Sequence, residues 1–105
     1  MTGFVASKHA AMLVIFSVYR LAHGSVGVCV ERPQHNANAT QTYRSLHEAK
    51  STLLSFGFAE EALDECLKLV PRLEERERLK FPPLDVPHHD LMAAGFGTLE
   101  LDVRP

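Results

Sequence analysis

The stretches Leu53-Leu54-Ser55-Phe56-Gly57-Phe58 and Leu91-Met92-Ala93-Ala94-Gly95-Phe96 share one pattern, which marks the ends of two helices. A glycine at the C′ position adopts positive φ without a Cβ clash, and the aromatic residue after it folds back onto the leucine at C3. We therefore predict helix stops at Gly57 and Gly95, with Phe58 and Phe96 as their apolar anchors.

A capping box at Ser45-Leu46-His47-Glu48 predicts where the first of these helices begins. The Ser45 hydroxyl is expected to accept a hydrogen bond from the amide at N3, and Glu48 to reach back to the cap. This helix then covers about residues 46–56. A second helix starts at about residue 60, where two glutamates favour the positive end of the helix dipole. Its apolar stripe comprises Leu63, Cys66, Leu67 and Val70, and Pro71 ends it.

Residues 11–21 and 26–32 predict a β-hairpin at the start of the chain. Both segments are rich in β-branched residues, and His23-Gly24-Ser25 between them has turn chemistry. The first strand is apolar on both faces, as expected for a central strand or for one that a partner covers. The apolar run at 10–18 is too short to span a bilayer, which requires about 20 residues.

The rest of the chain is less regular. Residues 33–41 are polar and aperiodic and predict a mobile loop. The mixed charges of residues 74–78 predict a solvated helical turn, and the proline-rich residues 79–87 predict an extended segment. A short helix capped by Asp85 or Val86 then runs to Gly95, and the alternating residues 98–103 predict a half-buried strand.

These elements follow the order β-β-α-α-α-β and predict a single α+β domain over residues 1–105. We expect two layers, with three helices packed on one face of a small three-stranded antiparallel sheet in the order 2-1-3. The chain has 105 residues, a formal net charge of −2 and no tryptophan, which disfavours a polyanion partner. The two cysteines form no framework pattern, so we expect reduced thiols and a cytoplasmic protein.

Surplus apolar surface on the first strand is the main functional signal. Alternation divides its side chains into two sets on opposite faces, one against the helices and one available to a partner. The interface is expected to be either Leu13, Ile15 and Tyr19 or the opposite set Met12, Val14, Phe16 and Val18. We therefore expect a protein that acts by protein–protein interaction, as a homodimer or an adaptor.

Two other classes of function have weaker support. His47, His88 and His89 are candidate ligands for a metal-dependent regulator or small enzyme, although they lack zinc-site spacing. The chain has no nucleophile, phosphate-loop or dinucleotide motif, and we expect no cofactor. Binding of single-stranded nucleic acid is the second alternative. It would require a sheet surface on which Tyr19 and Tyr43 lie beside Arg20, Arg32 and Arg44.

Residues 45–70 contain a helix, the sequence Phe56-Gly57-Phe58 and a second helix with an acidic first turn. This quarter of the chain resembles the first two helices of ubiquitin-associated domains, which carry a glycine–aromatic pair in the connecting loop. The third helix of that family has no counterpart, because Pro71 and a charge run follow. The resemblance implies a helical pair and assigns no binding residue.

Overall fold

The computed structural model describes residues 11–33 and 37–96, which form an α+β fold with a five-stranded, antiparallel sheet and three α-helices. The strands and helices follow the order β-β-β-α-α-β-β-α, which differs from the predicted order. The elements are β1 (Ala11–Arg20), β2 (Val26–Arg32), β3 (Ala37–Tyr43), α2 (Leu46–Ser55), α3 (Glu60–Leu67), β4 (Arg78–Lys80), β5 (Leu84–Pro87) and α4 (His88–Ala93), with short 3-10 turns η1 (Ala22–Gly24) and η3 (Val70–Arg72).

The hairpin of β1 and β2 confirms the predicted strands and their turn. Ser25 N–H donates to the carbonyl oxygen of Ala22 at 3.2 Å. The two residues between them, His23 and Gly24, have φ values of 61° and 81°. A turn with two successive positive φ values matches the right-handed twist of the flanking strands, so it closes the hairpin without splaying it.

The predicted loop at 33–41 is wrong over its second half, because β3 occupies residues 37–43 and pairs with β2 along its whole length. Ala37 and Ala39 are buried toward the helices, whereas Thr40 and Thr42 are exposed on the other side. This alternation is that of a strand, but alanine and asparagine have low β-propensity and hide it. Pairing with β2 supplies the stability that local propensity lacks.

The neighbour of β1 on its other edge is a broken strand formed by β4 and β5. Ser17 pairs with Lys80 and Val14 with Leu84, so this partner uses one more residue than β1 between the two pairs. The extra residue is a β-bulge at 81–83, where two exposed prolines stand on the sheet edge. The predicted adjacency of the first two strands is confirmed. The predicted third strand at 98–103 lies outside the described residues.

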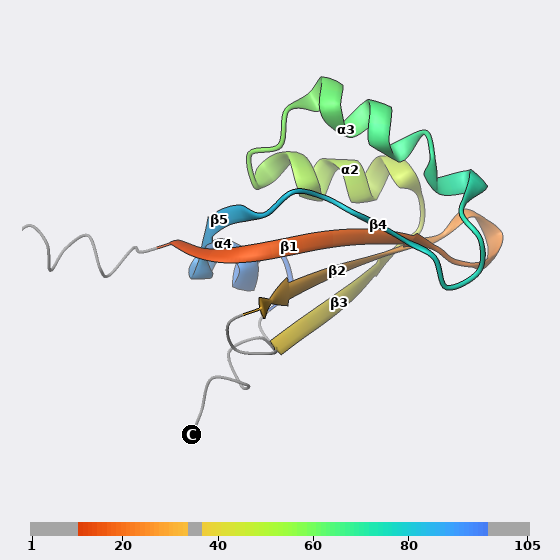
Figure 1. The fold of residues 1–105 in the computed structure, drawn as a ribbon. Helices are drawn as coiled ribbons and strands as arrows, with labels where there is room; N and C mark the ends of the chain where they lie inside the picture. Colours follow the sequence, from red (N-terminus) through yellow and green to blue (C-terminus); the bar gives the residue numbers. More distant parts are fainter. Residues whose placement is uncertain (1–10, 34–36, 97–105) are drawn as a thin grey trace, which may run out of the picture.

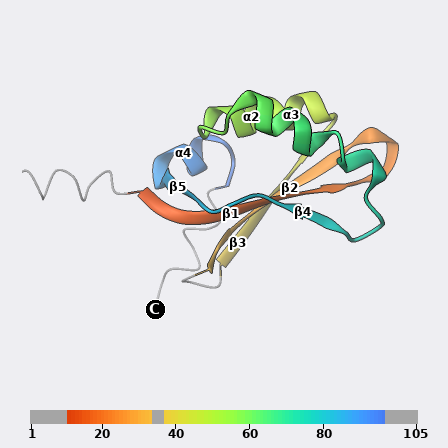
Figure 2. The same ribbon diagram turned by 45° about the horizontal axis from the view of Figure 1, so that its top comes forward.

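Helices α2 and α3 lie side by side on one face of the sheet, and α4 follows β5 at the end where β1 begins (Figures 1 and 2). Ser45 accepts the N–H of Glu48 at 3.3 Å, as predicted. The return contact differs, because the carboxylate of Glu48 accepts the N–H of Arg44, one residue before the cap, at 3.0 Å. The first contact occupies an amide that the helix itself leaves free, and the second ties the residue before the cap to the first turn.

The two predicted helix stops are confirmed, in two variants. Gly57 has φ 105° and Gly95 φ 97°. After α4 the Phe96 N–H donates to Leu91 O at 2.8 Å and Gly95 N–H to Met92 O at 3.1 Å, which is the full Schellman pair. After α2, the described contacts include only the counterpart of the second bond, from Gly57 N–H to Leu54 O at 3.0 Å.

Two predictions need correction, one for the start of α4 and one for the helical turn at residues 74–78. Helix α4 begins at His88 with Pro87 as its N-cap, not Asp85 or Val86, because those two residues belong to β5. Residues 74–78 form no helical turn. Glu77 N–H donates to Glu74 O at 3.0 Å, and Arg76 between them has φ 75°, so the chain makes a tight turn and enters β4.

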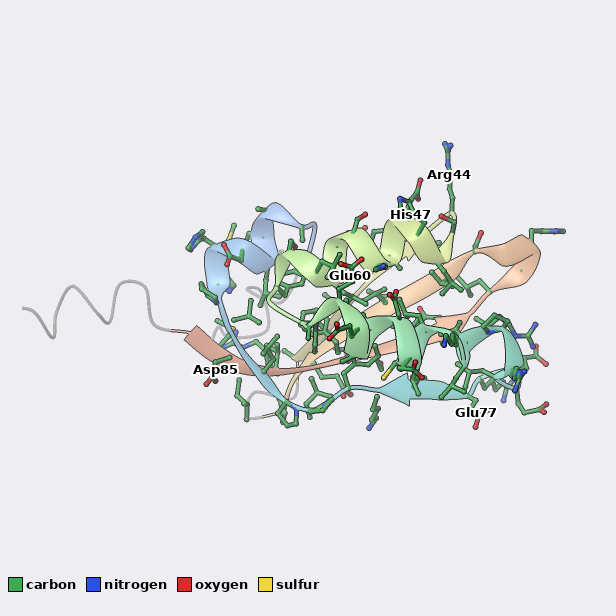
Figure 3. All side chains as sticks on the ribbon, turned by 90° about the horizontal axis from the view of Figure 1, so that it is seen from above. Arg44, His47, Glu60, Glu77 and Asp85 are labelled. Carbon is green, nitrogen blue, oxygen red and sulfur yellow. The ribbon has the colours of Figure 1, made fainter. Side chains whose placement is uncertain are left out.

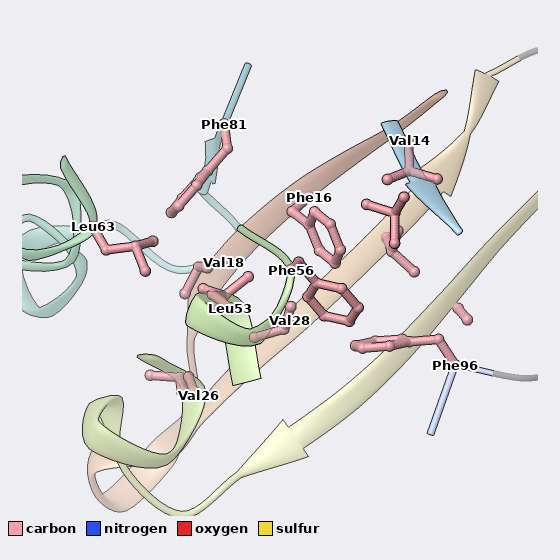
Figure 4. Packing of buried hydrophobic residues seen from close by; sticks show 14 of the residues in the cluster. Val14, Phe16, Val18, Val26, Val28, Leu53, Phe56, Leu63, Phe81 and Phe96 are labelled. Carbon is pink, nitrogen blue, oxygen red and sulfur yellow. The ribbon is translucent and has the colours of Figure 1, made fainter. Parts of the chain in front are cut away.

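Phenylalanine side chains fill the space between the sheet and the helices (Figure 4). Phe16 of β1 is fully buried at their centre, with ring centroids 4.9 Å from Phe56, 5.7 Å from Phe58 and 6.3 Å from Phe96. Phe58 also meets Phe81 edge-to-face at 5.2 Å. The residues around both helix stops therefore contribute rings to one aromatic cluster, which links the helix ends to the middle of β1.

Candidate interaction site

The face of the sheet opposite α2 and α3, here called the outer face, is not covered by any helix of the described residues (Figure 1). Strand alternation and register assign side chains to it. From β1 to β5 they are Leu13, Ile15, Ser17, Tyr19, Cys29, Glu31, Asn38, Thr40, Thr42, Arg78, Lys80 and Asp85, with Gly27 opposite Tyr19.

The structure separates the two candidate interface sets of β1. Val14, Phe16 and Val18 are completely buried beneath the helices, and Met12 packs against the same core. That set is therefore the hydrophobic core and cannot serve as an interface in the folded protein. Leu13, Ile15 and Tyr19 lie on the outer face, where Leu13 is 39% exposed.

The outer face is less apolar than the sequence of β1 alone suggests. Ser17 and Cys29 are paired at its middle and are both buried, and threonines of β3 border them. Its exposed apolar surface is concentrated at Leu13 and the half-buried Ile15. The exposed apolar surface of β1 is smaller than predicted, because Ser17 and its partner Cys29 occupy the middle of this face.

Tyr19 lies across the backbone of Gly27 on the neighbouring strand. A Cβ atom at residue 27 would lie 2.2 Å from the tyrosine Cζ atom, so only glycine leaves room for the ring. On the other neighbouring strand, the Arg78 guanidinium carbon lies over the ring, 4.8 Å from its centroid. This cation–π contact fixes both side chains at the turn end of the outer face.

Charges on the outer face are separated along β1. Arg78 and Lys80 lie near the hairpin turn, opposite Tyr19 and Ser17. Asp85 lies toward the start of β1, opposite Leu13, with Glu31 opposite Ile15 between them (Figure 3 labels Asp85). The face therefore has a basic end and an acidic end.

The candidate histidines do not converge. His47 lies at the start of α2, exposed, whereas His88 and His89 open α4, which lies beside the other end of α2 (Figure 3). His89 Nε2 lies 3.1 Å from the carboxylate of the adjacent Asp90. Within residues 11–33 and 37–96, no group of three or more His, Cys, Asp or Glu side chains is placed to hold a metal ion.

The two tyrosines proposed as a stacking platform point to opposite faces of the sheet. Tyr43 pairs with Val26 and packs against the core, whereas Tyr19 is on the outer face. Arg32 is buried, with 8% of its surface exposed, and Arg78 already occupies a face of the Tyr19 ring. The predicted double aromatic surface for single strands is therefore not formed.

Neither cysteine forms a disulfide: Cys29 is a buried free thiol on the outer face, and Cys66 a half-buried one on α3. No helix in the described part of the chain is long and apolar enough to cross a bilayer.

No protein-family model, curated protein or solved structure shows a significant match to this chain. The resemblance of residues 45–70 to ubiquitin-associated domains therefore stays local. After α3 the chain enters η3 and then β4, where that family has its third helix.

Proposed function

We propose that this protein acts by self-association, with a second copy of the chain packed against its outer face. The observation that carries the proposal is the position of Leu13, 39% exposed beside Ile15 on a face that no described helix covers. Apolar side chains exposed together at one end of a sheet face favour burial against a partner.

The charge separation along β1 favours a second copy over an unrelated partner. Lys80 and Asp85 lie opposite residues four apart on β1, about 13 Å at the usual rise per residue. A two-fold axis perpendicular to β1 places the basic end of one copy over the acidic end of the other. The same face is then complementary to itself, as an isologous dimer requires.

The size of the face fits a small interface, of the kind found in transient complexes. Four strands about 4.8 Å apart and the ten-residue β1 define a surface of roughly 20 by 33 Å. This is somewhat less than the area, about 800 Å² per partner, that a stable interface of standard size buries. We therefore expect a dimer that dissociates in the micromolar range, in a cytoplasmic protein whose two thiols remain reduced.

Sedimentation velocity over a wide range of protein concentrations tests the proposal, with Leu13→Lys as the disrupting variant. Lysine at this position faces Asp85 within the same chain, so the fold should persist while the apolar contact is lost. Leu69→Lys is the matched control, because Leu69 is 47% exposed but follows α3, away from the outer face. We expect a concentration-dependent dimer for the natural chain and the control, and a monomer for Leu13→Lys.

A charge exchange identifies the partner as a second copy. Lys80→Asp should weaken the dimer, because residue 80 of one copy then repels Asp85 of the other. Adding Asp85→Lys to this variant restores the attraction between residue 80 of one copy and residue 85 of the other, and should restore dimerisation. A natural chain that sediments as a strict monomer at every concentration contradicts self-association and leaves the adaptor alternative, in which the same face binds a different protein.

A further inference from the structure

The two edges of the sheet differ in how they are protected against pairing with another chain. One edge is the broken strand of β4 and β5, which carries Arg78, Lys80, Asp85 and the exposed prolines Pro82 and Pro83. The other edge is β3, seven residues long, with no charged residue, no proline and a continuous register with β2. Charges, prolines and bulges are the devices that prevent edge-to-edge pairing of natural sheets, and β3 has none of them.

The register shows which backbone groups of β3 point outward. In an antiparallel sheet, alternate residues of a strand direct their N–H and C=O groups to opposite neighbours. Phe16 O accepts the N–H of Phe81 at 2.9 Å, so the backbone of Phe16 points away from β2. Phe16 pairs with Val30, and Val30 pairs with Ala39, so the backbone of Ala39 points toward β2. The residues of opposite parity in β3 therefore direct their backbone groups outward; they are Asn38, Thr40 and Thr42.

These outward groups are available to another strand. Asn38, Thr40 and Thr42 are exposed, and within the described part of the chain β2 is the one strand that pairs with β3. The contact between β3 and the end of α4 uses a side chain, because the Gln41 amide donates to Gly95 O. It leaves the backbone of the edge unused. An exposed row of backbone donors and acceptors is a template for strand addition.

We propose that β3 pairs with β3 of a second copy of the chain, antiparallel about Thr40, so that the two sheets become one continuous sheet. In this register Thr40 lies opposite Thr40 of the second copy, and Asn38 lies opposite Thr42. The outward N–H and C=O groups of the two strands then meet as hydrogen-bonded pairs.

The sequence of β3 is complementary to itself in this register. It contains no charged residue, so pairing brings no like charges of the two strands together. On the outer face threonine meets threonine, which is a favourable cross-strand pair. On the helix side Ala37 lies opposite Tyr43, and Ala39 opposite Gln41, so a small side chain faces a larger one each time. A second copy therefore fits this edge without any charge or size conflict along the paired strand.

This inference does not rest on the outer-face dimer, because it uses the backbone edge of β3 and not the side chains of β1. A contact along one short strand is smaller than a standard interface, so we expect it to form at higher concentration, toward the millimolar range. The variant Leu13→Lys, which should be a monomer at micromolar concentration, isolates the edge contact. If the outer-face dimer does not exist, the natural chain serves equally well and the edge is tested unchanged.

Amide hydrogen exchange of the Leu13→Lys chain, measured at micromolar and at millimolar concentration, tests the pairing residue by residue. The outward amides of Asn38, Thr40 and Thr42 should exchange more slowly at the higher concentration, by about fivefold when the free chain is at about four times its dissociation constant. The amides of Ala39 and Gln41, which already face β2, should not change. Unchanged exchange of the three outward amides up to millimolar concentration overturns the proposal. So does slower exchange confined to β4 and β5.

Two substitutions at Thr40, each added to Leu13→Lys, separate the backbone from the side chain. Thr40→Pro removes the central outward N–H, and proline is tolerated on an edge strand where the N–H faces solvent. Thr40→Val is the matched control, because it keeps the N–H and a β-branched side chain. We expect the proline variant to sediment as a monomer at millimolar concentration and the valine variant as a dimer, with urea denaturation checking that both are folded. Equal dimerisation of the two variants contradicts pairing through the backbone of β3. The exchange measurement decides the proposal even if the proline variant fails to fold.

Discussion

The ring of Tyr19 occupies the space that a side chain at Gly27 would need, and the two residues are directly paired across β1 and β2. Gly27→Ala places a Cβ atom 2.2 Å from the tyrosine Cζ, so the ring must leave its position and its contact with Arg78. Because the half-buried ring can move aside, we expect only the loss of its contact with Arg78, about 0.5–1 kcal/mol in the free energy of unfolding, measured by urea denaturation.

A double-mutant cycle shows whether the tyrosine ring is the cause. In a Tyr19→Ser background the space above Gly27 is empty, and Gly27→Ala should then cost much less than it does in the natural chain. Equal costs in the two backgrounds would place the strain in the backbone at residue 27 and not in this contact.

The parts of the fold that the sequence predicted correctly depend on local chemistry. Gly57 and Gly95 end helices because their neighbours in sequence, including Phe58 and Phe96, favour that geometry by themselves. The first hairpin follows equally from its valine-rich strands and from the turn at His23-Gly24. In each case the relevant partner lies within a few residues, so a single sequence contains the information.

The elements that the sequence missed depend on distant partners. Strand β3 is a strand because β2 pairs with it, although residues 37–43 have weak strand propensity. The β4–β5 strand contains a two-proline bulge that conceals its continuity, and only its pairing with β1 reveals it. The hollow lined by residues 19–22 and by Glu75, Arg76 and Arg78 joins segments more than 50 positions apart in the chain, for which local spacing carries no signal.

The glycine at the end of α2 allows a clean measurement of backbone strain. Gly57 has φ 105°, and a Cβ atom built there has no neighbour within 4 Å. Gly57→Val therefore introduces strain without a packing clash, and we expect a loss of about 1–3 kcal/mol in the free energy of unfolding. Gly57→Asn, which tolerates positive φ better, should cost less. An unchanged melting temperature for the valine variant would show that the helix end adjusts freely.

Lys50 connects α2 to α3 and should make stability depend on alkaline pH. Its ammonium lies 2.8 Å from Asp64 and 2.9 Å from Glu60, and its side chain is 21% exposed. Hydrogen bonds to Asp64, followed by those to Glu60, raise the pKa of Lys50 above its ordinary value of 10.5.

The raised pKa of Lys50 determines how the stability of the fold changes with pH. Because the folded state holds the proton more tightly, the charged lysine stabilises the fold fully below pH 10.5, and the contribution disappears as the pH rises through the higher pKa of the folded state. Lys50→Met should thus be less stable than the natural chain at pH 7, with the difference narrowing at strongly alkaline pH in urea titrations. Lys68→Met is the control, because Lys68 is 68% exposed and its one ion pair within the described residues is with Glu65 on the preceding turn. A difference between Lys50→Met and the natural chain that stays constant from pH 7 into the alkaline range would show that the methylene stem of Lys50, and not its charge, joins the two helices.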